Sequence, residues 1–218
     1  MGKVASSTIY RSLRIQYEGV CLHSHSFSGK HVKPEVRFLY KLFKNKHIPL
    51  RVITLIREPI SRNISAFYEN FERDLGMKFE KNPYSTEELQ RQFLEKHDHK
   101  IPLIWLDHHI LGHFNIDVYE TPLPKEGFAH YQGKNVELLL MKHDLENTLK
   151  EQLLNKFLGR DSLKISDYNV GGSKTYSNSY KAFNELPLPK SYIDKMLESK
   201  YVNHFYADEK VSIAKKWT

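Results

Sequence analysis

The chain has 218 residues, a length that allows one domain with a sizeable buried core. Apolar residues make up 40% and charged residues 27% of the sequence, and these fractions exclude wholesale disorder. The 33 lysines and arginines outnumber the 26 aspartates and glutamates, which gives a formal net charge of +7. This excess favours anionic partners, namely phosphorylated cofactors, acidic polysaccharides, nucleic acid or membrane headgroups.

The single cysteine, Cys21, excludes an internal disulfide framework and a cysteine-rich metal site. No apolar run reaches the roughly 18 residues that a membrane span needs. The N-terminus also lacks the basic region and apolar core of a signal peptide. We therefore expect a protein of a reducing compartment, most simply the cytoplasm, with a lumenal domain separated from its anchor as the alternative.

The first predicted element is a loop of small and polar residues over 2–8 (GKVASST). Ile9, Leu13 and Tyr17 follow at intervals of four and predict a helix. A short buried strand is expected over 20–22.

Three further elements are expected before residue 70: a helix over 34–46, a strand over 50–56 (LRVITLI) and a helix from Pro59. The nearly continuous β-branched run is typical of strands buried in parallel sheets, so we expect it in the centre of the sheet. Proline suits the first position of a helix.

The second half of the chain also predicts mixed elements. A capping-box pattern from Ser85 to Glu88 opens a helix, and Asp144 is expected to cap another that ends near Leu158. The remaining expectations are a helix over 101–112, an irregular loop over 113–126, a hairpin of 128–132 and 136–142, a loop over 166–179, and helices over 189–199 and 202–216.

Helices alternate with apolar strands in the first seventy residues, which indicates an α/β fold with a parallel sheet. The chain has no internal repeat, low-complexity tract or linker. We therefore expect a single domain over residues 1–218.

The loop over 2–8 is the first segment that can carry chemistry. A small-residue loop in front of a helix exposes backbone N–H groups at the positive end of the helix dipole, which suits phosphate or sulfate. Lys3 adds a full charge, and Ser6, Ser7 and Thr8 add hydroxyl donors. A Walker A loop instead places its lysine directly before the hydroxyl that binds Mg²⁺. The alternative is an ordinary helix cap.

The second such segment is the strand-to-helix junction over 52–67 (VITLIREPISRNISAF). The strand delivers Arg57 to its carboxyl end, where open α/β sheets bind their ligands. Ser61 and Ser65 then lie one turn apart on the helix, so an arginine fork and a hydroxyl can grip one phosphate together. The alternative is that Arg57 pairs with Glu58 or with a solvated carboxylate and binds nothing.

These two segments together resemble the sulfotransferases that use 3′-phosphoadenosine 5′-phosphosulfate. Residues 3–8 (KVASST) are similar to their 5′-phosphosulfate loop, and Arg57 and Ser65, eight residues apart, are similar to their 3′-phosphate motif. Three later segments resemble a bacterial group of capsular polysaccharide synthesis proteins with a Lys-aromatic-Tyr-Ser signature; they are residues 116–119, 138–141 and 174–177.

The resemblance implies a P-loop-like three-layer fold, in which helices flank a mainly parallel sheet, and a reaction that needs no metal. The reaction is transfer of a sulfuryl group from 3′-phosphoadenosine 5′-phosphosulfate to a hydroxyl, with a carbohydrate or polysaccharide as the expected acceptor. The resemblance assigns the cofactor to Lys3, Val4, Ala5, Ser6, Ser7, Thr8, Arg57, Ser65, Lys174 and Tyr176. Lys3 is also implied to stabilise the leaving oxygen.

The chain departs from the family pattern at several points. Gly2 and Ala5 stand where the family usually has proline and glycine, and Thr175 replaces the aromatic residue before Tyr176. In the family a first strand precedes the phosphosulfate loop. The resemblance therefore implies a strand in front of Gly2 that is short or missing here.

The pair His23 and His25 supplies a candidate base for the acceptor hydroxyl. This segment resembles that of the uronyl 2-O-sulfotransferases, in which the second histidine is the base. Alternate residues of an extended segment face opposite sides, so only one of the two is expected to face the cofactor, and we prefer His25. His109 and His113 have i, i+4 spacing, but no HExxH or carboxylate pattern accompanies them, and no metal is expected.

Two rival functions stay open. A nucleotide-dependent kinase-like enzyme would need a Walker lysine and a magnesium-binding acid at a strand end, and neither is found. A non-catalytic module could instead bind acidic polysaccharide or nucleic acid through its net charge. We expect a hydroxyl acceptor as the partner, and no nucleic acid.

Overall fold

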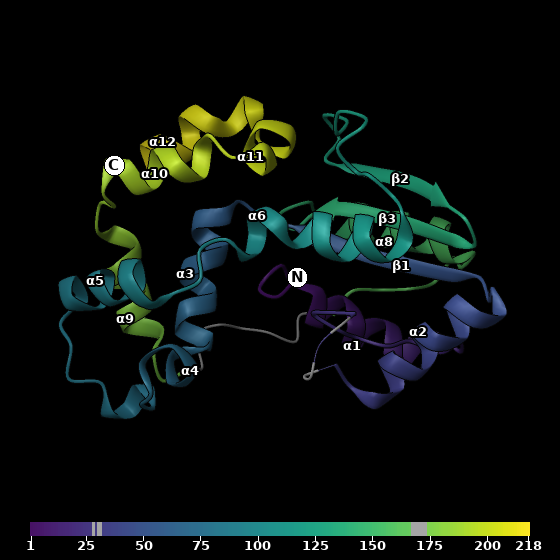
Figure 1. Ribbon diagram of the computed structural model, residues 1–218, viewed down its shortest axis with the longest axis horizontal. Helices are drawn as coiled ribbons and strands as arrows, with labels where there is room; N and C mark the ends of the chain where they lie inside the picture. The colour runs from purple at the N-terminus through teal and green to yellow at the C-terminus, as the bar shows by residue number, and fades with distance from the viewer. Residues whose placement is uncertain (28, 30–31, 167–173) are drawn as a thin grey trace. The chain divides into compact units, whose positions relative to one another are not determined.

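A computed structural model describes residues 1–27, 29, 32–166 and 174–218 (Figure 1). The chain divides into two compact units, and each is considered by itself. The first unit comprises Met1–Arg57 and Trp105–Asn169, and the second comprises Glu58–Ile104 and Val170–Thr218. The expected single domain over 1–218 stays a prediction.

The first unit contains the only sheet of the described residues, and the two parts of the chain that form this unit both contribute to it (Figure 1). Its elements are α1 (Ser6–Gln16), α2 (Pro34–Lys46), β1 (Leu50–Ile56), the π-helix η2 (Asp107–Leu111), α7 (Gly112–Phe114), β2 (Phe128–Gly133), β3 (Val136–Lys142) and α8 (Asn147–Leu158). Helix α6 (Ile101–Leu106) spans the boundary between the units.

The sheet has the order β1-β3-β2. Strand β1 pairs with β3 in parallel, from Leu50 opposite Val136 to Ile56 opposite Lys142, whereas β2 pairs with β3 antiparallel. Residues Leu138–Met141 are at most 1% exposed, as expected for an apolar run buried on both faces. The sheet is therefore a small mixed one, and the expectation of a mainly parallel sheet is wrong.

The position of β1 also differs from the expectation. Strand β1 lies at an edge of the described sheet, and β3 is central, so the prediction of a central strand over 50–56 is wrong. The reason is the hairpin, in which Asn135 adopts a left-handed conformation (φ 60°) and directs β3 back alongside β2. β3 then covers one edge of β1.

Two smaller expectations are also corrected. Residues 20–22 do not form a strand, because no described strand lies beside them, and Val20 is 80% exposed. Asp144 does not cap α8, since that helix begins at Asn147 and Glu146 occupies the N-cap position. The helices over 9–17 and 34–46, the strand over 50–56 and the hairpin are confirmed.

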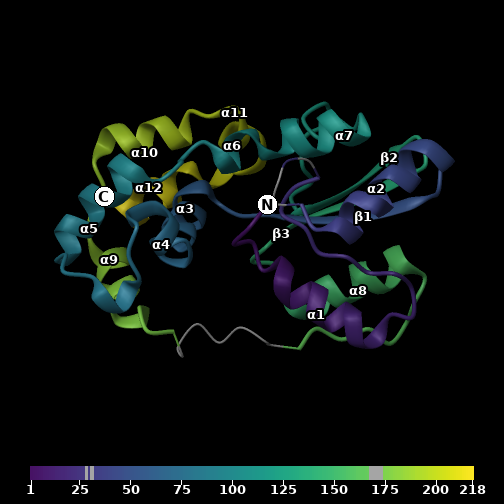
Figure 2. The ribbon, with the colours of Figure 1, turned by 60° about the horizontal axis from the view of Figure 1, so that its bottom comes forward.

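The chain that leaves α8 runs beside α1 (Figure 2). Gln16 Nε2 donates to the Lys164 carbonyl at 2.7 Å, and the Lys164 N–H donates to Gln16 Oε1 at 2.8 Å. The Ser166 N–H also donates to the hydroxyl of Ser12, which is buried on α1. These contacts fix α1, and with it the loop that precedes α1.

The second unit is helical in its described residues. Its elements are α3 (Pro59–Glu69), α4 (Phe71–Leu75), η1 (Phe79–Lys81), α5 (Thr86–Lys96), α9 (Ser177–Glu185), α10 (Lys190–Leu197), α11 (Lys200–Phe205), η4 (Ala207–Glu209) and α12 (Lys210–Trp217). Aromatic rings fill its core: Phe67, Phe93 and Phe183 are all fully buried. The predicted capping box at Ser85 is confirmed, whereas α9 was not predicted.

None of the helices in the described residues combines the length and the apolar character that a membrane span requires. The longest, α2, has 13 residues and carries charged side chains.

Candidate functional site

The loop before α1 has an unusual backbone. Lys3 and Ala5 both adopt left-handed conformations, with φ of 65° and 62°, although neither is glycine. Such residues cost of order 1 kcal/mol or more and are held in place by their surroundings, often at functional sites. Val4, between them, is 1% exposed and anchors the loop in the core.

This loop leaves the start of α1 open. Ala5 occupies the N-cap position and offers no side-chain hydrogen bond. Within the described part of the chain, no group accepts a hydrogen bond from the backbone N–H of Ser6 or Ser7. The first N–H groups of a helix need partners from outside the helix, and an anion can provide them.

Arg57 joins this loop to the sheet. It directly follows β1, and its Nη1 donates to the Lys3 carbonyl at 3.2 Å. The carboxylate of Glu58 caps α3. It accepts from the Ser61 N–H at 2.9 Å and from Trp217 Nε1 at 3.0 Å. The structure therefore brings Arg57 and Lys3 together at the carboxyl end of β1.

His23 is the histidine that contacts the loop. Its Nε2 lies 3.0 Å from the Ser6 hydroxyl, and its ring stacks on Tyr10 with the centroids 5.3 Å apart. Burial lowers the pKa of His23, so the ring is neutral near pH 7. Nothing in the sequence pattern indicated this contact, because the two residues lie 17 positions apart.

His25, the preferred base, lies beside His23. The two rings meet edge to face, with the centroids 4.7 Å apart, and His25 is exposed. Its backbone carbonyl accepts from Trp105 Nε1 at 2.8 Å, which fixes the segment. A side chain on Gly2 would lie 3.8 Å from the His25 ring, so the start of the chain and this histidine are neighbours.

The other predicted cofactor residues lie in the second unit. Ser65 is half-buried on α3, and none of the described residues forms a hydrogen bond with its hydroxyl. The Lys174 ammonium pairs with the Glu69 carboxylate, which also accepts from the Tyr176 hydroxyl at 2.8 Å. Residues 167–173 of the predicted loop lie outside the described residues.

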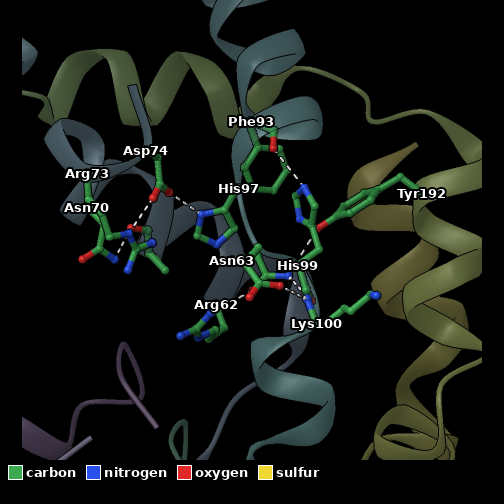
Figure 3. Close-up of polar contacts among 12 residues, drawn as sticks. Arg62, Asn63, Asn70, Arg73, Asp74, Phe93, His97, His99, Lys100 and Tyr192 are labelled. Carbon is green, nitrogen blue, oxygen red and sulfur yellow. Dashed lines mark hydrogen bonds and ion pairs between the residues drawn. The ribbon is translucent and has the colours of Figure 1, made fainter. Parts of the chain in front are cut away.

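A buried polar cluster in the second unit was not predicted (Figure 3). His97 Nδ1 lies 2.6 Å from an Asp74 carboxylate oxygen, and both side chains are at most 5% exposed. Burial lowers the pKa of His97, and the Asp74 carboxylate opposes this only in part. Asp74 and His97 are 23 positions apart, so only the packing of α4 against α5 could reveal the pair.

His99 extends this cluster toward α10. Its Nε2 donates to the Phe93 carbonyl at 2.9 Å, which leaves Nδ1 to accept from the Tyr192 hydroxyl at 3.0 Å (Figure 3). Asn63 Nδ2 donates to the His99 carbonyl at 3.1 Å. Both imidazole nitrogens are used by the neutral ring, and burial lowers the pKa of His99 to about 4. The hydrogen bonds of His99 thus connect α3, α5 and α10.

His109 and His113, in the first unit, contact aromatic side chains. In the stretches for which coordinates are described, no three His, Cys, Asp or Glu side chains gather as metal ligands would. His109 and His113 stack in parallel with centroids 5.8 Å apart, and His113 Nδ1 lies 2.8 Å from the Tyr40 hydroxyl. Burial lowers the pKa of His109 to about 4.

The neutral histidines predict a pH-dependent stability. Between pH 6.5 and 4 an unfolded chain protonates His99 while the folded chain does not, so the free energy of unfolding falls as the pH falls. The loss is at most about 3 kcal/mol, because solvent still reaches part of the His99 ring. Urea unfolding across this range should show the loss, and His99→Gln or His109→Gln should each make the dependence shallower. An unchanged slope in both variants would contradict it.

Comparison with known proteins identifies the family of this chain. The model of the NKWYS family, described as "Putative capsular polysaccharide synthesis protein", matches residues 74–207. No curated protein and no solved structure matches the chain. The matched range contains Lys174 and Tyr176 and, from the buried cluster, Asp74, His97, His99 and Tyr192. Lys3, Arg57 and Asn63 precede it. The chain therefore belongs to the NKWYS family.

Proposed function

We propose that this protein is a sulfotransferase that uses 3′-phosphoadenosine 5′-phosphosulfate and sulfates a hydroxyl of a carbohydrate. The observation that carries the proposal is the loop before α1. Two left-handed residues, Lys3 and Ala5, present the uncapped start of a helix, and Arg57 holds the loop at the carboxyl end of β1. Such an arrangement suits a phosphate or sulfate group.

The loop and its side chains would hold the 5′-phosphosulfate. The backbone N–H groups at the start of α1 and the hydroxyls of Ser7 and Thr8 donate to its oxygens, and Lys3 neutralises its charge. The Ser6 hydroxyl already lies within hydrogen-bond distance of His23, which orients it. Val4, Ala5 and Arg57 contribute by fixing the loop.

In the reaction, the acceptor oxygen forms a bond to sulfur as the bond between sulfur and the bridging phosphate oxygen breaks. His25 takes the proton of the acceptor hydroxyl, and Lys3 stabilises the charge that develops on the leaving oxygen. We assign the base to His25 rather than His23, as the resemblance to the uronyl 2-O-sulfotransferases implies, and His23 Nε2 lies 3.0 Å from the Ser6 hydroxyl. The products are a sulfate ester and 3′-phosphoadenosine 5′-phosphate.

The 3′-phosphate distinguishes this cofactor from ATP, and we assign it to Arg57 and Ser65. The guanidinium is a charged donor at a strand end, and the Ser65 hydroxyl follows eight residues later on α3. The resemblance also assigns Lys174 and Tyr176 to the nucleotide, and both side chains contact the Glu69 carboxylate.

Family membership supports a carbohydrate acceptor, since the family is one of capsular polysaccharide synthesis proteins. The net charge of +7 suits an acidic polysaccharide as well as the cofactor. A non-catalytic protein that binds polyanions could do so through the same net positive charge. It would show no preference for a 3′-phosphorylated nucleotide.

The first prediction compares two substitutions in the nucleotide site. Arg57→Ala should weaken binding of 3′-phosphoadenosine 5′-phosphate more than binding of adenosine 5′-phosphate, by about tenfold or more, because a charge-assisted hydrogen bond is worth about 1.5–3 kcal/mol. Lys3→Ala should weaken both nucleotides alike. Titration calorimetry gives the affinities, with Arg51→Ala, at an exposed position on β1, as the control. Equal losses for both nucleotides in Arg57→Ala would remove Arg57 from the 3′ site.

The second prediction concerns the base. A positioned base contributes about 10²–10⁴-fold in rate, so His25→Ala should slow turnover by that factor while nucleotide affinity stays within about threefold. His23→Ala should act differently, because it releases Ser6 and should weaken nucleotide binding. Turnover at saturating cofactor, with a polysaccharide acceptor, separates the two. Normal turnover in His25→Ala together with loss of turnover in His23→Ala would assign the role of the base to His23. An active double variant would exclude a histidine base.

A further inference from the structure

A pocket of about 410 Å³ lies in the first unit, where the ends of α2 and α7 meet the turn between β2 and β3 (Figure 2). This volume is enough for a sugar unit or another small polar ligand. His47 ends α2, Asn115 ends α7, and Asn135 forms the turn. All three line the pocket and adopt left-handed conformations. Such conformations gather at functional sites, and the loop before α1 is the other place in the described chain where non-glycine residues adopt them.

The pocket has an apolar wall that is formed without a ligand. Phe43 of α2 and Phe114 of α7 line it and pack edge to face, with the centroids 5.6 Å apart. The two rings are 8% and 5% exposed. The contact between Tyr40 and His113 joins the same two helices. A ligand therefore enters a site whose walls already hold each other in place, which reduces the cost of binding.

The charged side chains at this pocket are cationic. Lys44 and Lys134 line it, and none of the described residues that line it is an aspartate or a glutamate. Lys44 Nζ lies 5.6 Å from the centroid of the Tyr40 ring. In the described part of the chain, no carboxylate forms an ion pair with either lysine. Burial, and after it the charge of Lys44, lower the pKa of His113, so this ring is neutral near pH 7.

The negative groups close to the pocket do not cancel this charge. The Glu137 carboxylate, two residues after Asn135, pairs with Arg51 at 3.2 Å. The carboxyl end of a helix carries about half a negative charge, and Lys46 in the last turn of α2 offsets it. The pocket therefore suits an anionic group.

One of the two lysines also belongs to a row of cations on α2. Arg37, Lys41 and Lys44 follow one another at intervals of four and three residues, so they lie on one face of the helix, and all three are exposed. Seven residues of helix span about 10 Å. This basic row, defined as Arg37, Lys41 and Lys44, leads away from the pocket. A small anion would need the pocket alone, whereas a chain with repeated negative charges can contact the whole row.

We propose that this pocket binds one acidic sugar unit of a polysaccharide and that the basic row binds the units that follow it. Lys44 and Lys134 would meet the carboxylate or sulfate group of the sugar. The side-chain amides of Asn115 and Asn135 can donate to and accept from its hydroxyls. The family, described as one of capsular polysaccharide synthesis, favours a polysaccharide over nucleic acid as the anionic chain.

The pocket is separate from the loop before α1. The Leu50 N–H donates to the Asn135 carbonyl at the amino end of β1, whereas Arg57 follows the carboxyl end. A strand of seven residues spans about 23 Å, so a nucleotide phosphate at Arg57 leaves this pocket free. The inference rests on the pocket and the family match and not on the proposed reaction.

The test measures binding to the full chain without nucleotide, by titration calorimetry at one fixed salt concentration. The probes are a hexasaccharide of glucuronate, which is carboxylated, and a heparin hexasaccharide, which is also sulfated. The variant with Lys44→Gln and Lys134→Gln should bind at least one probe about tenfold more weakly than the unmodified chain.

A matched control removes two positive charges elsewhere in the first unit. Lys125 and Lys156 are exposed and do not line the pocket, and the variant with Lys125→Gln and Lys156→Gln should lose less than about threefold. Both variants should bind 3′-phosphoadenosine 5′-phosphate as the unmodified chain does, which keeps this test distinct from that of the proposed function.

The basic row is tested with ligands of two lengths. The variant with Arg37→Gln and Lys41→Gln should weaken binding of the hexasaccharide several-fold and leave binding of glucuronate itself unchanged. Glucuronate binding can be followed by the amide resonances of Asn115 and Asn135, whose shifts should disappear in the variant with Lys44→Gln and Lys134→Gln.

Three results would overturn the proposal. Equal losses in the pocket variant and the control variant would show that only net charge matters. Failure of the unmodified chain to bind either hexasaccharide would exclude an acidic saccharide. Tighter binding of a single-stranded oligonucleotide of equal charge, with the same dependence on Lys44 and Lys134, would assign the pocket to nucleic acid.

Discussion

The parallel ladder between β1 and β3 is the contact on which the arrangement of the first unit depends. It joins segments that lie 86 residues apart in the chain, and it is the only pairing of β1 among the described residues. The ladder fixes β1 along its whole length, from Leu50 to Ile56, and therefore also fixes the position of Arg57, which directly follows the strand. Arg57 in turn holds the Lys3 carbonyl, and the loop before α1 takes its place at the end of the sheet. Without the ladder, neither candidate segment would have a defined position.

The sequence predicted local features well, because they depend on neighbouring residues. The β-branched run over 50–56 and the apolar stripe after Thr8 need only their own periodicity. The order of the strands could not be predicted in this way, since β3 reaches β1 through a pairing that no short window contains. The sheet was therefore expected to be mainly parallel with 50–56 at its centre. Two contacts at the site were not predicted: His23 beside Ser6, and Glu58 as the cap of α3. The first joins residues 17 positions apart, and the second depends on which partners the Glu58 carboxylate takes.

The two lines of support for the function concern different parts of the chain. The family match covers residues 74–207 and connects the protein with capsular polysaccharide synthesis. The loop geometry and the position of Arg57 belong to residues 1–57 and point to an anion site. Neither observation derives from the other: one gives a family linked to capsular polysaccharide synthesis and the other an anion site, and the proposal of polysaccharide sulfation combines the two. Lys174 and Tyr176 are the candidate residues inside the matched range, and their shared partner, Glu69, lies just before it.

The central claim is that the site selects a nucleotide with a 3′-phosphate. Titration calorimetry of the unmodified chain at one fixed salt concentration, with 3′-phosphoadenosine 5′-phosphate and ATP as ligands, tests it most directly. A site with a dedicated 3′-phosphate contact should bind the first ligand at least about tenfold more tightly than ATP, although ATP carries more phosphate at its 5′ end. Equal affinity for the two nucleotides, or tighter binding of ATP, would contradict the account and leave a binder of polyanions.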